Sequence, residues 1–248
     1  MTTFQKCLAI GGLMGLTLLP ASTLASTEVG GLQFGGKGGI TIGSCAGFDS
    51  FFDAEEWGEH TPDVTKGSRT GVAFGGFATY WLSPKLGLQA ELLWAQGGCK
   101  RDFDVVIENV TGKLEMTAAL TYIEIPILVK YAFNGASVSS PFLCFGPSVG
   151  LRSAAELEMK ATSEYAGSYS TTEDIKDYVK STNFSLMAGL GYTLRLDQVS
   201  VAFEARYVLG LIDVMEETGR IEVEEDEYIM LDETKPRTFA IMISVSGN

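Results

Sequence analysis

Hydrophobic side chains occupy every second position along most of the chain, a period that is typical of strands with one apolar face. The clearest example is residues 122–133 (YIEIPILVKYAF), where isoleucine, valine and aromatic residues take every odd position. Seven further segments show the same alternation: residues 32–42, 72–82, 86–95, 143–151, 183–195, 199–211 and 238–245. The pattern predicts eight strands and no long amphipathic helix.

The connections between these segments alternate between short and long. Residues 83–85, 134–140 and 197–198 are short and rich in turn-forming side chains, whereas residues 43–69, 98–116, 156–182 and 213–237 form long connections. Short turns at one end and long loops at the other are typical of outer-membrane barrels, whose short turns face the periplasm. We therefore predict an all-β fold, an eight-stranded antiparallel up-and-down transmembrane β-barrel.

The composition of the two strand faces decides between a membrane barrel and a soluble carrier with an apolar interior. The less apolar face consists mainly of glycine, alanine, serine and threonine with few charges, whereas a face in water would carry many. Small side chains suit the narrow interior of an eight-stranded barrel. The other face is almost free of charge, as contact with lipid requires. The sequence favours the membrane barrel.

Aromatic residues of the apolar face gather near the short turns. They predict a periplasmic aromatic girdle at the level of the lipid headgroups. The residues of this girdle are Phe34, Tyr80, Tyr131, Phe133 and Tyr192.

A few charged residues share the less apolar face, which a membrane barrel turns towards its lumen. Unpaired buried charge is costly, so we expect these side chains to form a lumenal ion-pair network with a structural role. Its members are Lys37, Glu91, Glu124, Lys130, Arg195, Glu204 and Arg206. The alternatives are a water-filled lumen with loosely screened charges and a gated pore.

The first 25 residues predict a signal peptide: Lys6 precedes the apolar stretch 8–19, and small residues stand at positions 23–25. Cleavage there leaves residues 26–248 as the outer-membrane barrel domain; a transmembrane anchor is the alternative. Three cysteines remain after cleavage. Cys45 and Cys99 stand at the long-loop ends of the first and third strands, so they form either a disulfide or two free thiols.

Composition excludes several classes of function. The 248 residues have a net charge of −13, which argues against a nucleic-acid partner, and the four long connections together carry −15. His60 is the only histidine, and no motif of a catalytic nucleophile accompanies it. The acidic residues 222–233 lack the spacing of a dedicated calcium loop. We expect no enzymatic activity, no cofactor and no metal.

Five segments in order are similar to the PorT-like outer-membrane β-barrel family, whose members are often labelled porin family proteins. They are residues 34–42 (FGGKGGITI), 88–98 (LQAELLWAQGG), 122–131 (YIEIPILVKY), 141–150 (PFLCFGPSVG) and 207–213 (YVLGLID). The resemblance implies an eight-stranded up-and-down barrel in a bacterial outer membrane. It implies no defined activity, because the family is named mainly for its fold. The chain departs from the aromatic final residue usual in such barrels, since it ends in VSGN.

The prediction from sequence is thus a protein of the bacterial cell outer membrane with a side-chain-filled lumen, long acidic extracellular loops and a structural or interaction role. A narrow passive pore is the first alternative, and a carrier of an apolar ligand is the second. We expect a monomer surrounded by outer-membrane lipid, with the barrel-assembly machinery as its partner during insertion. The chemistry of a surface partner is left open.

Overall fold

The computed structural model describes residues 29–46, 63–107, 110–163, 167–215, 220–224, 227–230 and 234–247. The predicted signal peptide (1–25) and His60 lie outside these described residues, and so do the side chains of the acidic run 222–233. Within the described ranges, no helix has the length and apolar character needed to cross a membrane.

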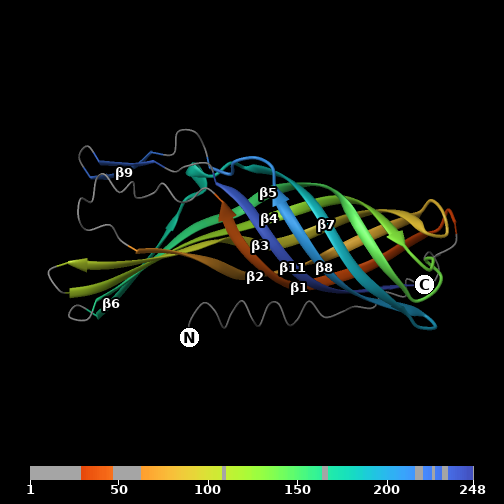
Figure 1. Ribbon diagram of the computed structural model, residues 1–248. Coiled ribbons are helices and arrows are strands. Elements are labelled where there is room, and N and C mark those ends of the chain that lie inside the picture. The colour runs from red at the N-terminus through yellow and green to blue at the C-terminus, as the bar shows by residue number, and fades with distance from the viewer. Residues whose placement is uncertain are drawn as a thin grey trace, which may run out of the picture.

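Eight long strands form a closed antiparallel ring (Figure 1). They are β1 (Leu32–Ala46), β2 (Asp63–Trp81), β3 (Leu86–Ile107), β4 (Val110–Ala132), β5 (Ser140–Ser163), β7 (Thr182–Arg195), β8 (Val199–Gly210) and β11 (Lys235–Gly247). Each strand pairs with its neighbours along this order, and β11 pairs with β1 to close the barrel. The remaining elements are β6 (Gly167–Asp174), the short 3-10 helix η2 (Lys176–Tyr178), β9 (Arg220–Glu224) and β10 (Glu227–Met230). The predicted fold class is confirmed.

Apolar side chains face outward along the whole barrel wall. Ile127 and Ile241, for example, are 50% and 57% exposed, whereas the lumenal Gln89 and Thr79 are 2% and 0% exposed. This is the reverse of a water-soluble barrel and matches a wall surrounded by acyl chains. The five residues of the predicted girdle all lie on this outer face near the short turns, between 40% and 44% exposed.

The lumen is filled at the short-turn end by the turn between β4 and β5. Ala136 of this turn is buried against Trp81 and Ala132. Its backbone N–H donates to the carbonyl oxygen of Pro84 at 2.7 Å, which joins this turn to the β2–β3 turn. The turn therefore covers the short-turn mouth of the barrel with its own backbone.

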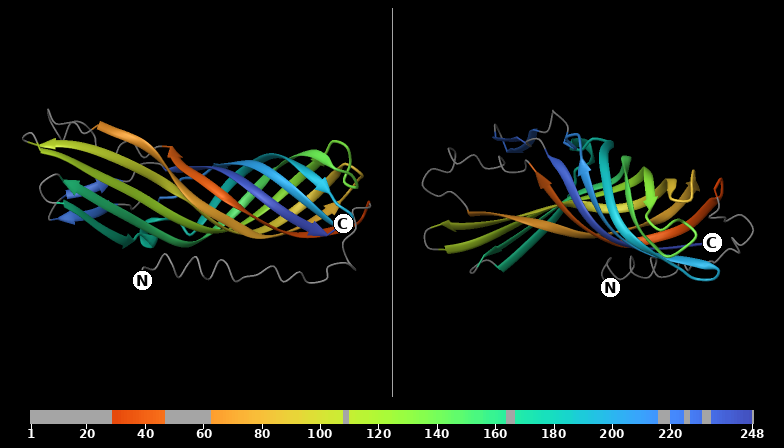
Figure 2. Two further views of the ribbon diagram at one scale, coloured as in Figure 1. Left: turned by 90° about the horizontal axis from the view of Figure 1, so that it is seen from below. Right: turned by 45° about the vertical axis from the view of Figure 1, so that its right-hand side comes forward.

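Two of the predicted long connections, 98–116 and 156–182, consist largely of strands and not of irregular loops. Residues 98–107 and 110–116 form the ends of β3 and β4, which stay paired in register from Leu93–Glu124 to Ile107–Val110. Residues 156–163 continue β5, and β6 and η2 occupy much of the rest of that connection. Figure 2 shows these strands running out beyond the barrel wall. The sheet that protrudes comprises residues 63–68, 99–107, 110–118, 156–163 and 167–174; we call it the protruding sheet.

An apolar cluster joins the protruding sheet to the barrel. Phe103, Met116 and Leu157 lie on its inner face and are buried against Ile175 and Val179, which flank η2. Val214 and Met215, which follow β8, complete the cluster. Burial of such side chains supplies roughly 1.5–3 kcal/mol each. The cluster fills the mouth of the barrel at the protruding sheet, which we call the upper end. The turn at Ala136 fills the mouth at the short turns, the lower end.

Candidate functional site

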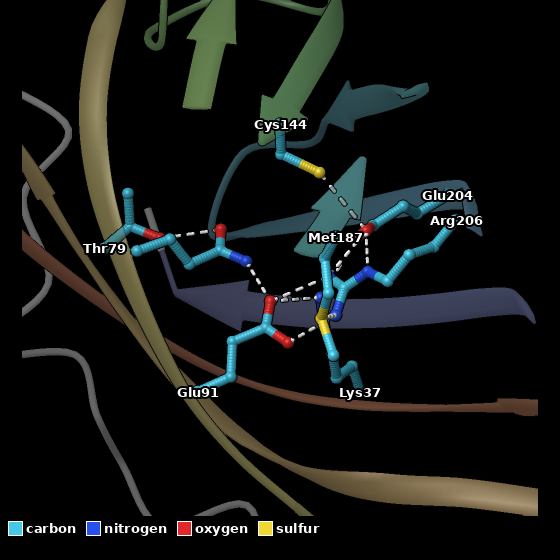
Figure 3. Close-up of polar contacts among 8 residues, drawn as sticks. Lys37, Thr79, Glu91, Cys144, Met187, Glu204 and Arg206 are labelled. Carbon is cyan, nitrogen blue, oxygen red and sulfur yellow. Dashed lines mark hydrogen bonds and ion pairs between the residues drawn. The ribbon is translucent and has the colours of Figure 1, made fainter. Parts of the chain in front are cut away.

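Four charged side chains meet at the centre of the lumen. Lys37 projects from β1, Glu91 from β3, and Glu204 and Arg206 from β8. Lys37 Nζ lies 2.7 Å from Glu91 Oε1 and 3.0 Å from Glu204 Oε2. Arg206 Nη1 lies 2.8 Å from Glu91 Oε2, and Arg206 Nη2 lies 2.6 Å from Glu204 Oε1. Each cation thus contacts both anions, and we call this group the ion-pair layer (Figure 3).

The ion-pair layer is buried and electrically neutral. The four side chains are between 0% and 5% exposed. Two positive and two negative charges attract one another, and this attraction offsets the cost of removing each charge from water. This compensation depends on all four members, because removal of one leaves the opposite charges that it contacted without a full set of partners.

Neutral side chains take up the remaining hydrogen bonds of the layer. Gln89 donates its amide to Glu91, and Thr79 Oγ1 donates to Gln89 Oε1 at 3.0 Å. On the opposite wall the thiol of Cys144 donates to Glu204 Oε1 at 3.4 Å. These contacts orient the carboxylates, and none of the three residues belonged to the predicted network. Their inward position follows from the strand period, but their pairing across the lumen requires the barrel register.

Glycine on the inner wall makes room for the layer. A Cβ atom at Gly189 would lie 2.8 Å from Cys144 Sγ and 3.0 Å from Glu204 Oε1. A larger residue there would push the carboxylate away from Arg206. The small residues of the inner face are therefore required by the charged ones beside them.

Apolar side chains lie next to the ion-pair layer inside the lumen. Leu128, Phe142, Cys144, Met187 and Ala202 form one buried cluster. The ring of Phe142 lies over Gly191, where a Cβ atom would stand 2.5 Å from its Cζ. Together, the layer and this cluster fill the middle of the lumen.

The described residues line two small cavities, one on the long-strand side of the filled middle (the upper cavity) and one on the short-turn side (the lower cavity). The upper one offers about 40 Å³ to water centres and is lined by Thr41, Glu124, Asn183 and Arg206, among others. The lower one offers about 20 Å³ and is lined by Gln33, Lys130, Arg195 and Ser246, among others. A water molecule needs roughly 10–15 Å³ of such space, so each cavity holds only one to a few waters.

The other three predicted network residues stand apart from the ion-pair layer. Glu124 lines the upper cavity, and no hydrogen bond or ion pair joins it to the described residues. Lys130 Nζ lies 4.2 Å from the centre of the Phe142 ring, a cation–π contact. Arg195 donates to the carbonyl oxygen of Ala136 and so ties β7 to the turn that fills the short-turn mouth of the barrel.

The structure joins Cys45 and Cys99 by a disulfide, with their Cα atoms 5.5 Å apart. The two strands that carry them are separated by β2 in the sheet order. Beside them, a Cβ atom at Gly43 would lie 2.5 Å from the carbonyl oxygen of Gly98, so the backbones of β1 and β3 nearly touch. Arg101, 1% exposed, donates to the carbonyl oxygen of Cys45 at 3.3 Å. Sequence analysis placed Arg101 in a loop and therefore missed it.

Charged residues cover the outer face of the protruding sheet. Lys100 Nζ lies 3.2 Å from Asp102 Oδ1 and 3.5 Å from Glu115 Oε2, and Lys113 also pairs with Glu115. Partial burial lowers the pKa of Lys100, but hydrogen bonding and attraction to Asp102 and Glu115 outweigh it and raise that pKa. Likewise Lys100 and Lys113 lower the pKa of Glu115 against the opposing effect of burial. Among the described residues, no group of three His, Cys, Asp or Glu side chains could hold a metal.

Comparison with known proteins gives a family match. The family model described as outer membrane protein beta-barrel domain matches residues 21–216. No curated protein matches the chain in sequence.

Three solved structures illustrate the likeness in fold. The outer membrane protein OprG from Pseudomonas aeruginosa is 14% identical, with 90% of this chain and 97% of OprG covered and a TM-score of 0.44. Ail, the attachment invasion locus protein of Yersinia pestis, is 13% identical, with 86% and 97% covered and a TM-score of 0.31. Neisserial surface protein A is 11% identical, with 87% and 98% covered and a TM-score of 0.34.

Proposed function

We propose that this protein is a non-conducting barrel that acts through its surface-exposed protruding sheet. The premise is that the chain belongs to the outer membrane protein beta-barrel domain family. The protein is a β-barrel of the bacterial outer membrane, and its short turns face the periplasm as in other such barrels. The protruding sheet then stands on the extracellular side. The role is structural or interactive, and no catalytic activity is proposed.

One observation carries this proposal: the ion-pair layer and the adjacent apolar cluster separate two cavities that are each too small for hydrated ions to pass. A passive pore, the first alternative, would need a continuous wet path past Lys37, Glu91, Glu204 and Arg206. A carrier of an apolar ligand, the second alternative, has no support in a lumen whose middle is already filled by the ion-pair layer and the apolar cluster. The narrower assignment to the PorT-like family is part of the same proposal and rests on the five sequence segments.

Conductance across a planar lipid bilayer tests this proposal. Wild-type protein, refolded and shown to be closed by its heat-modifiable gel mobility, is expected to leave the bilayer silent. The matched control is the same preparation after heat denaturation, which accounts for currents from detergent or contaminants. Stable unitary current steps from the folded protein that disappear in the heated control would establish a pore and contradict the proposal.

A further inference from the structure

Strand β6 forms a free edge of the protruding sheet. The order of strands in the sheet ends at β6, which pairs only with β5 among the described residues. Seven of its eight residues are exposed, and Tyr169 is 71% exposed. Main-chain donors and acceptors along this edge therefore face solvent.

The ladder between β5 and β6 identifies which residues present these groups. The N–H of Ile175 donates to the carbonyl oxygen of Ala155, and the pairing with β5 continues in the same register to Gly167. In an antiparallel pair, alternate residues exchange hydrogen bonds with the neighbour. Residues 169, 171 and 173 therefore bond to β5, and Ser168, Ser170 and Thr172 direct their N–H and C=O groups to the free edge.

The two edges of the protruding sheet differ in their protection. Proteins block exposed edges with charges, proline or bulges, because unprotected edges pair with other strands. The β2 edge carries Asp63, Lys66 and Gly67 within six residues. The β6 edge reads GSYSTT from Gly167 to Thr172, with no charge and no proline. Among the described residues, the β6 edge from Gly167 to Thr172 is therefore the less protected of the two.

We propose that β6 adds as a strand to the β6 of a second copy of this protein, in antiparallel orientation, with Ser170 opposite Ser170. This inference rests on the proposed function, since it names the partner of the protruding sheet. The register places Ser168 opposite Thr172, so the edge-facing residues Ser168, Ser170 and Thr172 meet the same three residues of the second copy. Three such pairs exchange about six main-chain hydrogen bonds.

The charge distribution of β6 selects a second copy in this orientation. Its only charged residues, Glu173 and Asp174, lie at one end. Antiparallel pairing sets Glu173 of one copy opposite Gly167 of the other, so the acidic ends stay apart. Parallel pairing would bring the acidic ends together, and like charges on paired strands repel.

Antiparallel pairing also fixes where the second copy stands. The chain in β6 runs from the outer end of the protruding sheet back towards the barrel (Figure 1). Two such strands that run in opposite directions have their barrels at opposite ends of the joint sheet. The contact therefore joins barrels in two facing membranes, and each barrel remains a monomer in its own membrane.

Clustering of proteoliposomes tests this pairing. Phosphatidylcholine vesicles that contain the full barrel are expected to cluster, which light scattering detects, while protein-free vesicles do not. Ser170→Pro removes the central N–H, which the pairing with β5 leaves unused among the described residues, and should reduce clustering to the protein-free level. Ser170→Ala keeps this N–H and should cluster like wild type. Heat-modifiable mobility confirms that each variant is folded.

A charge exchange separates self-pairing from other causes of clustering. Ser170→Lys and Ser170→Glu should each fail to cluster alone, because like charges then face each other. Vesicles with the Lys variant mixed with vesicles with the Glu variant should cluster again. Three results would each overturn the inference: no clustering of wild-type vesicles, clustering that persists in Ser170→Pro, or no clustering when the Lys and Glu variants are mixed. Bilayer conductance of the same preparations tests separately whether the barrel is non-conducting, as the proposed function states.

Discussion

The barrel wall and the protruding sheet are built from the same strands but have opposite polarity. In the membrane part of β4, Ile125 and Ile127 face outward and are 40% and 50% exposed. Higher on the same strand, Met116 and Leu120 face inward and are 5% and 1% exposed, while Glu115 lies on the outer face. The direction in which alternate side chains point does not change along β4. What changes is the medium outside the sheet, from lipid to water.

This difference in polarity dictates different means of stabilisation. The membrane part cannot use an apolar interior as its main source of stability, because its apolar side chains already contact lipid; its interior is held by the ion-pair layer and its hydrogen bonds. The protruding sheet has a conventional apolar inner face and a disulfide at its base. Substitutions should therefore have different effects in the two regions.

The largest effect is expected from Arg206→Met. The change leaves Glu91 and Glu204 with Lys37 as their one cationic partner, and breaking a buried charge pair costs about 3–5 kcal/mol. Urea unfolding in lipid vesicles, followed by gel mobility, measures the loss. The control is Ser185→Ala, a buried lumenal residue outside the ion-pair layer, which should change stability little. Equal stability of Arg206→Met and wild type would show that the layer is not a source of stability.

Charge on the outer face should matter in the wall and not in the protruding sheet. Ile127→Arg sets a guanidinium among acyl chains and should cost about 2–4 kcal/mol near the bilayer midplane. Thr117→Arg lies on the outer face of the protruding sheet, beside Lys100 in the pairing of β3 and β4, and should cost little. The same urea unfolding compares the two variants, and similar losses would contradict the change of medium along β4.

The disulfide should stabilise the protruding sheet more than the wall. Cys45 and Cys99 are 54 residues apart, and a bond that closes such a loop contributes about 2–4 kcal/mol to stability. The paired strands β1–β3 already constrain this loop, so we expect the lower value for Cys45→Ser with Cys99→Ser. Hydrogen exchange should increase in residues 99–118 and stay unchanged in the membrane part. Faster exchange throughout the barrel would instead show that the disulfide supports the whole fold.

The smallest effect is expected from Glu115→Gln, which removes the partly exposed pairs with Lys100 and Lys113. Exposed pairs contribute less than about 1 kcal/mol. Because the folded protein lowers the pKa of Glu115, its contribution is present at neutral pH and is lost as pH falls through that lowered pKa. Wild type and Glu115→Gln should therefore converge in stability in acid. A difference that grows in acid would contradict the assignment.

The membrane part of the fold could be predicted from the sequence because lipid leaves a strong pattern. Residues such as Ile123, Ile125 and Ile127 mark the outer face, and the strand period then places Glu91 and Glu204 inside. The protruding sheet could not be found in the same way. Above the membrane the apolar residues of β4 change to the inner face, so the outward apolar pattern stops where the strand does not.

The alternation of apolar and polar residues does not show which lumenal side chains contact one another. Inward direction was predictable for Lys37, Glu124 and Arg206 alike, but only the register around the ring sets their heights. That register brings Lys37 and Arg206 to the same carboxylates and leaves Glu124 beside the upper cavity. The free edge of β6 was equally hidden, because residues 167–174 show no apolar alternation.

A cysteine scan along β4 with spin labels tests the reversal of polarity most directly. Single cysteines from position 113 to 129, in a Cys144→Ser background in lipid bilayers, report access to oxygen from lipid and to a nickel chelate from water. We predict that odd positions from 123 to 129 are accessible to oxygen, that odd positions from 113 to 117 are accessible to the chelate, and that even positions are protected from both. The account would be contradicted if labels at lumenal positions such as 124 or 128 were as accessible to oxygen as labels at the neighbouring odd positions. It would also be contradicted if labels at odd positions near 115 were accessible to oxygen from lipid.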